Sequence, residues 1–591
     1  MSRLALAVSR FAAPLINAQP PAPARGFLFQ RLMQLKLALG LGLLPVAIAV
    51  APAHSAEEIR VLYGPIQLSV SVKSLATFAE TGTIEPDLAA YAARFSDQQL
   101  RDIRRVLGSS VEVDEVALAN FLYTPQGEAL LRRLGNVIRN RSTSGFYALR
   151  ASLILTASEP DGATPIDFLR QFPTDSVVVD VDSALSIASE LNQLINVTSE
   201  ALALVERQFE QAVDSSPAVS FSAATVPRRE GSYEWERETF MVEDPGRDRQ
   251  FRYDLYLPDR DTPAPVIVIS HGLGSDRTTY AYLARHLASY GFVVALPEHP
   301  GSNAEYIQDL FAGAADQVAD PSEFVDRAQD ISSVLDDLTR RAEADAALRV
   351  RLDMDQVGVV GQSFGGYTAL AIAGASIEVQ RLQRVCDQEE GEPIDSLNVS
   401  LLLQCRAVEL FPREAETAQI TLRDERVKAV IAINPIGSIV FGRQGFSEID
   451  IPIMIITGTA DVVAPTLSEQ ILPFTWLTVD NKYLLVMRGG THFSTIGTSE
   501  GGSEAVPLPP EITGTEQELA LARLYVQALS VAFFRTYVSN QPEFRPYLSP
   551  TYVNQLSDAP LPLNIVRSLN ADRLAQLIKN TSLVVSASEL E

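Results

Sequence analysis

Hydrophobic positions divide the chain into two stretches with different periodicities. From residue 57 to about 215, apolar residues recur with the spacing of amphipathic helices, and Leu100, Ile103 and Leu107 lie on one face of such a segment. No cluster of chemically reactive side chains accompanies this pattern. We therefore expect a helical domain of unknown role, followed by a linker over 216–230 that is rich in Ser, Ala, Val and Pro.

From residue 231 to 545, short β-branched runs alternate with helical segments. The runs lie at 266–269, 292–296, 357–360, 427–433, 453–456 and 483–486. This alternation is typical of a mainly parallel sheet covered by helices on both faces. The interval 377–426 breaks the rhythm and is predicted to be an inserted lid. A helix over 516–537 is expected to pack on the sheet, and the tail 546–591 is expected to be helical.

Length and charge restrict the function further. The chain has 591 residues, 46% of them hydrophobic and 20% charged, which is ordinary for a globular protein of more than one packed unit. Its net charge of −25 argues against a nucleic-acid partner, because phosphate binding needs a basic patch. The simplest interpretation is that the acidity keeps the protein soluble.

The first 56 residues have the pattern of a secretory signal. The apolar run 37–50 follows Arg31 and Lys36 and precedes small residues, with possible cleavage after Ser55 or Ala56. The run is short for a membrane span, although an uncleaved anchor is the alternative. Met33 would make a more ordinary start than Met1. We expect an exported protein, periplasmic or secreted, with no membrane span after signal removal.

Two cysteines, Cys386 and Cys405, are separated by 19 residues in the predicted lid. In an exported protein we expect them to form a disulfide, with two buried free thiols as the alternative. Other common metal ligands do not cluster with them, so we predict no metal site.

A serine lies in a motif suited to nucleophilic catalysis. The sequence GQSFGG places Ser363 between Gly361 and Gly365, directly after the predicted strand 357–360 and before a helix. A sharp strand-to-helix turn would expose the hydroxyl, and flanking glycines avoid clashes across that turn. We predict that Ser363 is a nucleophile on such a turn.

An acid and a base follow the serine in chain order. Asp461 comes after the predicted strand 453–456, and His492 after the strand 483–486. His492 is the only one of five histidines beyond Asp461, and Asp480 is a weaker candidate because it enters a strand. We predict a catalytic triad of Ser363, Asp461 and His492.

Backbone amides would stabilise the oxyanion of such a reaction. The sequence SHGLG at 270–274 follows a predicted strand, and we expect the amides of Leu273 and Phe364 to form the oxyanion hole. An ordinary glycine-rich turn is the alternative. His271 is expected to make structural hydrogen bonds rather than act as a base.

The segments SHGLGSDRTTYAYLARHLASYGFVVALPEH and GQSFGG resemble the platelet-activating-factor acetylhydrolase and dienelactone-hydrolase-like branch of the α/β-hydrolases. They are also similar to bacterial polyester hydrolases and cutinases. The resemblance covers about 230–500 and implies an α/β-hydrolase fold. The segment before it looks like an uncharacterised domain that precedes such hydrolases, which suggests no activity for it.

This sequence departs from the patterns of these families at two points, which affect the expected substrate more than the expected reaction. The resemblance to acetylhydrolases implies an acid in the loop after the strand that follows the nucleophile. Here that loop, 433–436, has no carboxylate, which favours Asp461 as in polyester hydrolases. Dienelactone hydrolases use cysteine where this chain has Ser363.

The combined prediction is a serine hydrolase that cleaves a small-molecule or lipid carboxylic ester through an acyl-enzyme, without a cofactor. A serine peptidase or a cutinase-like polyester hydrolase would use the same triad. A non-catalytic extracellular binding protein on a hydrolase scaffold is the alternative of another class. Acyl-chain length, oligomeric state and protein partners do not follow from the sequence.

Overall fold

Nine strands form one sheet in a computed structural model that describes residues 55–63, 66–111, 113–140, 143–159, 162–216, 221, 226–386, 398–411, 419–500 and 510–579. The strands are β5 (Trp235–Asp244), β6 (Arg249–Pro258), β7 (Ala264–Ser270), β8 (Val293–Pro297), β9 (Leu352–Gln362), β12 (Val427–Ile433), β13 (Ile453–Gly458), β14 (Lys482–Met487) and β15 (Leu563–Val566). Their order is β15-β14-β13-β12-β9-β7-β8-β6-β5. The six from β14 to β8 run parallel, which confirms the predicted architecture.

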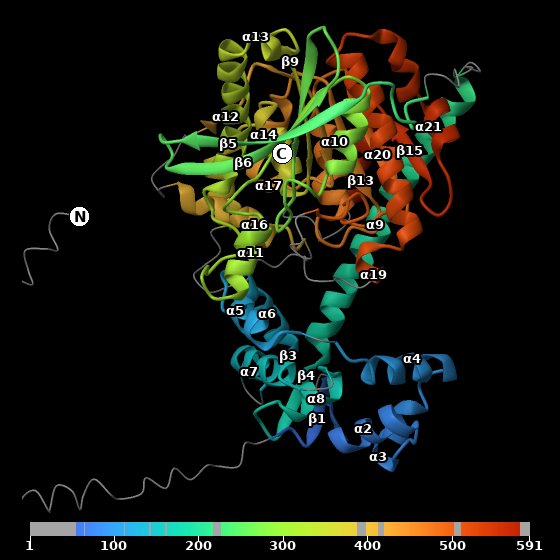
Figure 1. Cartoon of the computed structure of the whole chain (residues 1–591). Helices are drawn as coiled ribbons and strands as arrows, with labels where there is room; N and C mark the ends of the chain where they lie inside the picture. Colours follow the sequence, from blue (N-terminus) through green and yellow to red (C-terminus); the bar gives the residue numbers. More distant parts are fainter. Residues whose placement is uncertain are drawn as a thin grey trace, which may run out of the picture. The chain divides into compact units, whose positions relative to one another are not determined.

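Helices cover this sheet on both faces (Figure 1). Helix α10 packs beside α20, and α12 packs beside α14. Strands β7, β12 and β13 and the second half of β9 lie between these layers and are almost wholly buried, as expected for a parallel sheet. The large helices of this part are α10 (Ala281–Ser289), α12 (Glu323–Ala344), α14 (Phe364–Ile372), α17 (Ser438–Ser447) and α20 (Glu516–Tyr537).

The N-terminal part corrects one prediction. Most of it is helical, but it also contains a four-stranded sheet of order β2-β1-β4-β3. Strand β1 pairs with β4 more than a hundred residues later. Strand β2, IQLSVS, alternates apolar and polar residues, a local signal that the helical prediction overlooked. The elements are β1 (Glu58–Tyr63), β2 (Ile66–Ser71), α2 (Val72–Thr81), α3 (Pro86–Ala92), α4 (Asp97–Leu107), α5 (Glu115–Leu122), α6 (Pro125–Val137), β3 (Ile138–Arg139), α7 (Phe146–Ala157), α8 (Pro165–Arg170) and β4 (Ser176–Asp180).

Helix α9 (Val181–Ser215) joins the two parts of the chain. Val197, Ala201, Val205 and Phe209 repeat every four residues and therefore form one stripe along this helix. All four are buried in the same hydrophobic cluster as the nine-stranded sheet. The end of the predicted helical segment thus contributes to the core of the hydrolase-like part.

The C-terminal tail also differs from its prediction. It contains helices, but β15 adds an antiparallel ninth strand beside β14. The polar Asn564 interrupts its apolar run, LNIV, unlike the runs that marked the parallel strands. The tail elements before and after it are η3 (Pro542–Leu548), α21 (Pro550–Leu556) and α22 (Ala571–Lys579).

The predicted lid leaves the main sheet directly after the nucleophile helix. Its ends, β10 (Ile377–Glu378) and β11 (Gln419–Ile420), pair with each other as a two-stranded ribbon. Between them lie α15 (Val379–Cys386), α16 (Leu401–Gln404) and the 3-10 helix η1 (Cys405–Leu410). Residues 387–397 and 412–418 of the lid lie outside the described residues.

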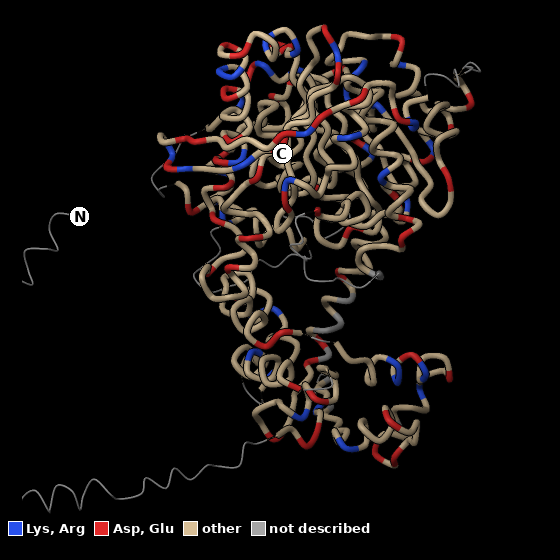
Figure 2. Tube along the Cα trace, viewed as in Figure 1, with Lys and Arg blue, Asp and Glu red and all other residues tan. Residues whose placement is uncertain are grey.

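Two other predictions lie wholly or partly outside the described residues. They are the signal region, apart from residues 55 and 56, and much of the 216–230 linker. Within the described part of the chain, no helix combines the length and apolarity needed to cross a bilayer. Basic residues are interspersed with acidic ones along the trace (Figure 2).

Candidate active site

Ser363 occupies a strained turn between β9 and α14. Its φ of 55° and ψ of −116° place a non-glycine residue in a region that L-amino acids rarely adopt. A Cβ on Gly361 would collide with the carbonyl of Gly365, and one on Gly365 would collide with the carbonyl of Ser270. Both positions therefore need glycine, as predicted from the motif.

The three predicted triad residues meet at the carboxyl end of the parallel strands. His492 Nε2 lies 2.9 Å from Ser363 Oγ, and His492 Nδ1 lies 2.7 Å from Asp461 Oδ2. All three side chains are buried, with Ser363 8% exposed. The imidazole can therefore accept the serine proton at Nε2 while Nδ1–H donates to the carboxylate.

Asp461 is held by more than the histidine. Its Oδ1 accepts backbone hydrogen bonds from Val463 at 2.9 Å and Ala464 at 2.7 Å. Its Oδ2 accepts a bond of 2.6 Å from the side-chain amide of Asn434, in the loop after β12. Sequence reasoning noted that this loop lacks a carboxylate but did not identify Asn434 as a partner of the acid.

Leu273 and Phe364 lie in the two segments that flank Ser363. Leu273 lines the same cavity as Ser363 and His492. Among the described residues, neither the Leu273 nor the Phe364 backbone N–H donates a hydrogen bond to a protein acceptor. Both amides are therefore available to donate to an oxyanion.

A buried cation that was not predicted from the sequence connects these two segments. Arg327 in α12 donates to the carbonyl of His271 and lies over the Phe364 ring, 4.8 Å from its centroid. It also donates to Ser302 Oγ at 2.5 Å and to Thr368 Oγ1 at 3.0 Å. Burial lowers the pKa of Arg327 to about 10, so it stays charged at neutral pH.

His271 is held neutral beside Arg327. Its Nδ1–H donates to the carbonyl of Gly272 at 2.8 Å, and its Nε2 accepts the backbone N–H of His299 at 3.1 Å. Since a carbonyl can only accept and an amide can only donate, these two bonds require the neutral ring. Burial, together with the Arg327 cation, lowers the pKa of His271 to about 4. This agrees with the structural role predicted for it.

Comparisons with known proteins agree with this architecture. The model of an α/β-hydrolase family of unknown function (DUF1400) matches residues 55–180, and that of platelet-activating factor acetylhydrolase, isoform II, matches residues 255–323. The chain has an α/β-hydrolase fold. Neither family match reaches Ser363, Asp461 or His492.

Curated relatives resemble only part of this chain. The platelet-activating factor acetylhydrolase of Canis lupus familiaris is 31% identical over 140 residues, which cover 18% of this chain and 31% of that protein. Those of Bos taurus and Cavia porcellus are 28% and 29% identical over similar stretches. The chain spans about a third of the length of these relatives. Hydrolase relatives support an ester hydrolase in general terms.

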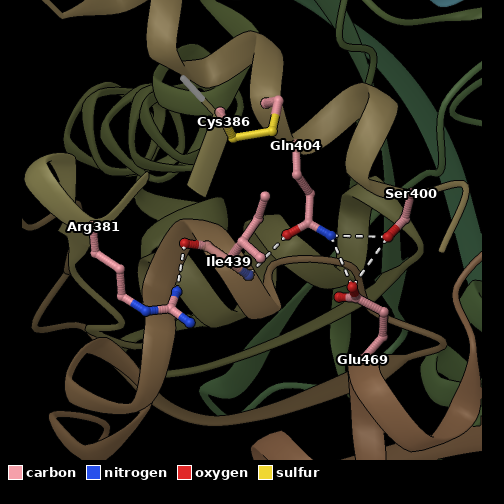
Figure 3. Close-up of a disulfide and its surroundings, with 7 residues drawn as sticks. Arg381, Cys386, Ser400, Gln404, Ile439 and Glu469 are labelled. Atoms are coloured by element: carbon pink, nitrogen blue, oxygen red, sulfur yellow. Dashed lines mark hydrogen bonds between the residues drawn. A yellow bond between two sulfur atoms is a disulfide. The ribbon is translucent and has the colours of Figure 1, made fainter. Parts of the chain in front are cut away.

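A disulfide inside the lid and a buried carboxylate outside it hold the lid residues near Gln404 in place (Figure 3). Cys386 and Cys405 are bonded, with Cα atoms 5.5 Å apart, which confirms the predicted pair. Glu469, in the π-helix η2 (Leu467–Ile471), accepts hydrogen bonds from Ser400 at 3.1 Å and Gln404 at 2.9 Å. These contacts hold the lid against the loops at the carboxyl ends of the strands.

One cavity of about 940 Å³ lies above Ser363. Lid residues 398–403 form part of its wall, and Ser363 and His492 also line it. Its lining is mostly apolar. The site can therefore hold an apolar substrate next to the nucleophile.

Proposed function

We propose that this protein hydrolyses carboxylic esters through an acyl-enzyme formed on Ser363. The continuous contact from Asp461 through His492 to the Ser363 hydroxyl, at 2.7 and 2.9 Å, carries this proposal. The strained backbone of Ser363 and the two free amides beside it support the same chemistry.

The reaction would proceed in two halves. His492 Nε2 takes the Ser363 proton as Oγ attacks the ester carbonyl, and the amides of Leu273 and Phe364 stabilise the oxyanion. The carbon–oxygen bond to the alcohol then breaks, and the proton on Nε2 passes to the departing oxygen. A water molecule gives a proton to Nε2 and attacks the acyl-enzyme. Return of this proton to Ser363 Oγ releases the carboxylic acid.

Three alternatives use the same scaffold. A serine peptidase or a cutinase-like polyester hydrolase would share the Ser363 chemistry and differ in the substrate. A binding protein on a hydrolase scaffold would need no nucleophile. The hydrogen-bonded serine and the energetic cost of its strained backbone argue against that last alternative.

Hydrolysis and labelling together test the proposal. Wild-type protein is expected to hydrolyse p-nitrophenyl esters, and a fluorophosphonate probe is expected to modify Ser363, as found by peptide mass spectrometry. Ser363→Ala is the matched control and should lose both properties. Absence of turnover on p-nitrophenyl acetate, butyrate and palmitate, together with an unmodified Ser363, would favour the binding protein. Cleavage of peptides but not esters would favour the peptidase.

We also propose that the protein is exported to the periplasm or secreted. The charged and apolar order of residues 31–56 and the Cys386–Cys405 disulfide support this location. N-terminal sequencing of protein recovered outside the cytoplasm tests it. A mature chain that begins near residue 56 is the expected result, and retention of the whole protein in the cytoplasm would contradict it.

A further inference from the structure

The cavity above Ser363 has a second wall made by the N-terminal domain. Phe121 of α5 lines it, and so do four residues of α6. Those four, Gln126, Ala129, Leu130 and Arg133, are spaced three and four residues apart, which places them on one face of the helix. One face of α6 therefore borders the same space as the nucleophile, although about 230 residues separate them in the chain.

Specific contacts dock this wall on the hydrolase part. The side-chain amide of Asn120 in α5 donates a bond of 2.7 Å to the carbonyl of Phe311, the last residue of α11 (Ala304–Phe311). Carbonyls in the last turn of a helix lack intrahelical partners, so this bond satisfies a group that would otherwise need water. Phe311 itself lines the cavity. The docking contact and the cavity wall are thus adjacent.

Two observations on α6 indicate that this wall faces a ligand. Gln126 is 6% exposed, and its amide oxygen and nitrogen have no hydrogen-bond partner among the described residues. Leaving a buried amide unpaired costs about 1–3 kcal/mol, which a ligand with a polar group would offset. Leu130 is 41% exposed, although it is a large apolar residue beside an apolar cavity. Contact with a hydrocarbon chain would remove it from water.

The size of the cavity indicates the kind of ligand. At about 940 Å³ it is near the upper end of the ~300–1,000 Å³ typical of small-molecule sites. A two-carbon acyl group would fill a small fraction of it. Each methylene moved from water to an apolar wall contributes roughly 0.8 kcal/mol, so a long chain would gain most from this lining.

We propose that the N-terminal domain is a substrate-binding cap and that the substrate is an ester with a long hydrocarbon chain. This inference rests on the proposed ester hydrolysis. The chain lies between the lid and the exposed face of α6, with Leu130 in contact with it. The α6 face then determines chain-length preference, and Ser363 performs the same chemistry on short and long esters.

A pair of substitutions on α6 tests the cap. Leu130→Arg places a cation in the cavity wall, whereas Leu134→Arg makes the same change one turn later, at a residue that does not line the cavity. Leu130 and Leu134 are 41% and 39% exposed, so both sites tolerate the larger side chain and both variants change the net charge equally. The measured quantity is the ratio of kcat/KM for p-nitrophenyl decanoate to that for p-nitrophenyl acetate.

In wild-type protein this ratio is expected to be at least ten. Leu130→Arg should lower it at least tenfold, the milder Leu130→Gln should give an intermediate ratio, and Leu134→Arg should stay within twofold of wild type. A comparison of kcat/KM for decyl acetate and ethyl acetate shows whether the long hydrocarbon chain belongs to the alcohol instead of the acyl group. A preference for decyl acetate in wild type that is lost in Leu130→Arg supports the cap equally.

Failure of the cap and failure of the hydrolase are distinguishable. The cap would be overturned, with esterase activity intact, if both arginine variants had the same ratio of kcat/KM. It would also be overturned if p-nitrophenyl decanoate and decyl acetate were both cleaved more poorly than the corresponding short esters. Loss of all ester turnover in wild-type protein, with Ser363 unlabelled, would instead overturn the proposed function. Circular dichroism of the variants identifies any that do not fold, and the Leu130→Gln ratio then decides.

Discussion

Replacement of Arg327 by methionine tests how the oxyanion segments are held. The guanidinium donates to the His271 carbonyl, Ser302, Thr368 and, at 3.3 Å, to Ser270 Oγ, and it is fully buried. Methionine has similar length but no donor. The buried acceptors would therefore lose their partner, and the nearby carboxylates would lose a compensating charge.

Breaking such a buried charge network costs about 3–5 kcal/mol of unfolding free energy. A chain of this size has a larger urea m-value than the ~1–3 kcal/mol per molar of small proteins, so the midpoint should fall by about 1 M or less. Catalysis should suffer as well, because the loop that carries Leu273 loses its anchor at His271. A displacement of about 1 Å at a reacting group can cost ~100-fold, so we expect kcat to fall by roughly that factor.

Arg327→Lys separates the two effects. Lysine keeps the positive charge but lacks the planar fork that reaches several acceptors at once, so stability should recover in part while kcat stays low. Urea unfolding followed by tryptophan fluorescence and p-nitrophenyl ester kinetics measure both. An Arg327→Met variant within 1 kcal/mol of wild type and with unchanged kcat would refute the reasoning.

Four further predictions concern single groups. Ser363→Ala should abolish ester turnover and leave the thermal melt nearly unchanged, by steady-state kinetics and calorimetry. Asp461→Asn should lower kcat by about 10⁴, because the amide favours the wrong imidazole tautomer; substantial remaining activity would move the acid role elsewhere. The pKa of His271, about 4 in the fold against 6.5 ordinarily, means that the unfolded chain binds more protons between these values. Stability should thus fall as pH falls from 6.5 to 4, by up to ~3 kcal/mol, and urea midpoints of His271→Asn should fall less; parallel pH profiles would contradict this. Cys405→Ser should lower the unfolding free energy by about 3 kcal/mol, and mass spectrometry should find Cys386 and Cys405 of wild type alkylated only after reduction.

The parallel sheet was predictable because its strands are local signals. The β-branched runs at β7, β9, β12 and β13 are each long enough to be recognised alone. The strands that were not predicted, β1 to β4 and β15, need a different explanation. Strands β2 and β4 do carry local signals, an alternation in IQLSVS and the run VVV, but these lie among helical segments and were overlooked. In β15 the polar Asn564 interrupts a short apolar run, so no signal stands out.

The convergence of Ser363, Asp461 and His492 was predictable for a similar reason, since a motif and strand ends mark these residues. The groups that hold them were not. Arg327 lies in a helix whose many charged residues predict exposure to solvent, and Glu469 lies in a segment with no motif. Both become significant only when the fold buries them among acceptors or donors from remote loops. Contacts of this kind between distant segments cannot be predicted from local sequence patterns.

The position of Asn434 explains how the acid can differ between relatives without loss of the triad geometry. The resemblance to acetylhydrolases implies an acid after β12, where this chain has Asn434, while Asp461 follows the neighbouring parallel strand β13. Adjacent strands lie only about 4.8 Å apart, so side chains from either carboxyl end can reach the same imidazole. Here the Asn434 amide donates to the very oxygen of Asp461 that accepts from His492. Asn434, at the position where the resemblance implies an acid, thus orients the Asp461 carboxylate.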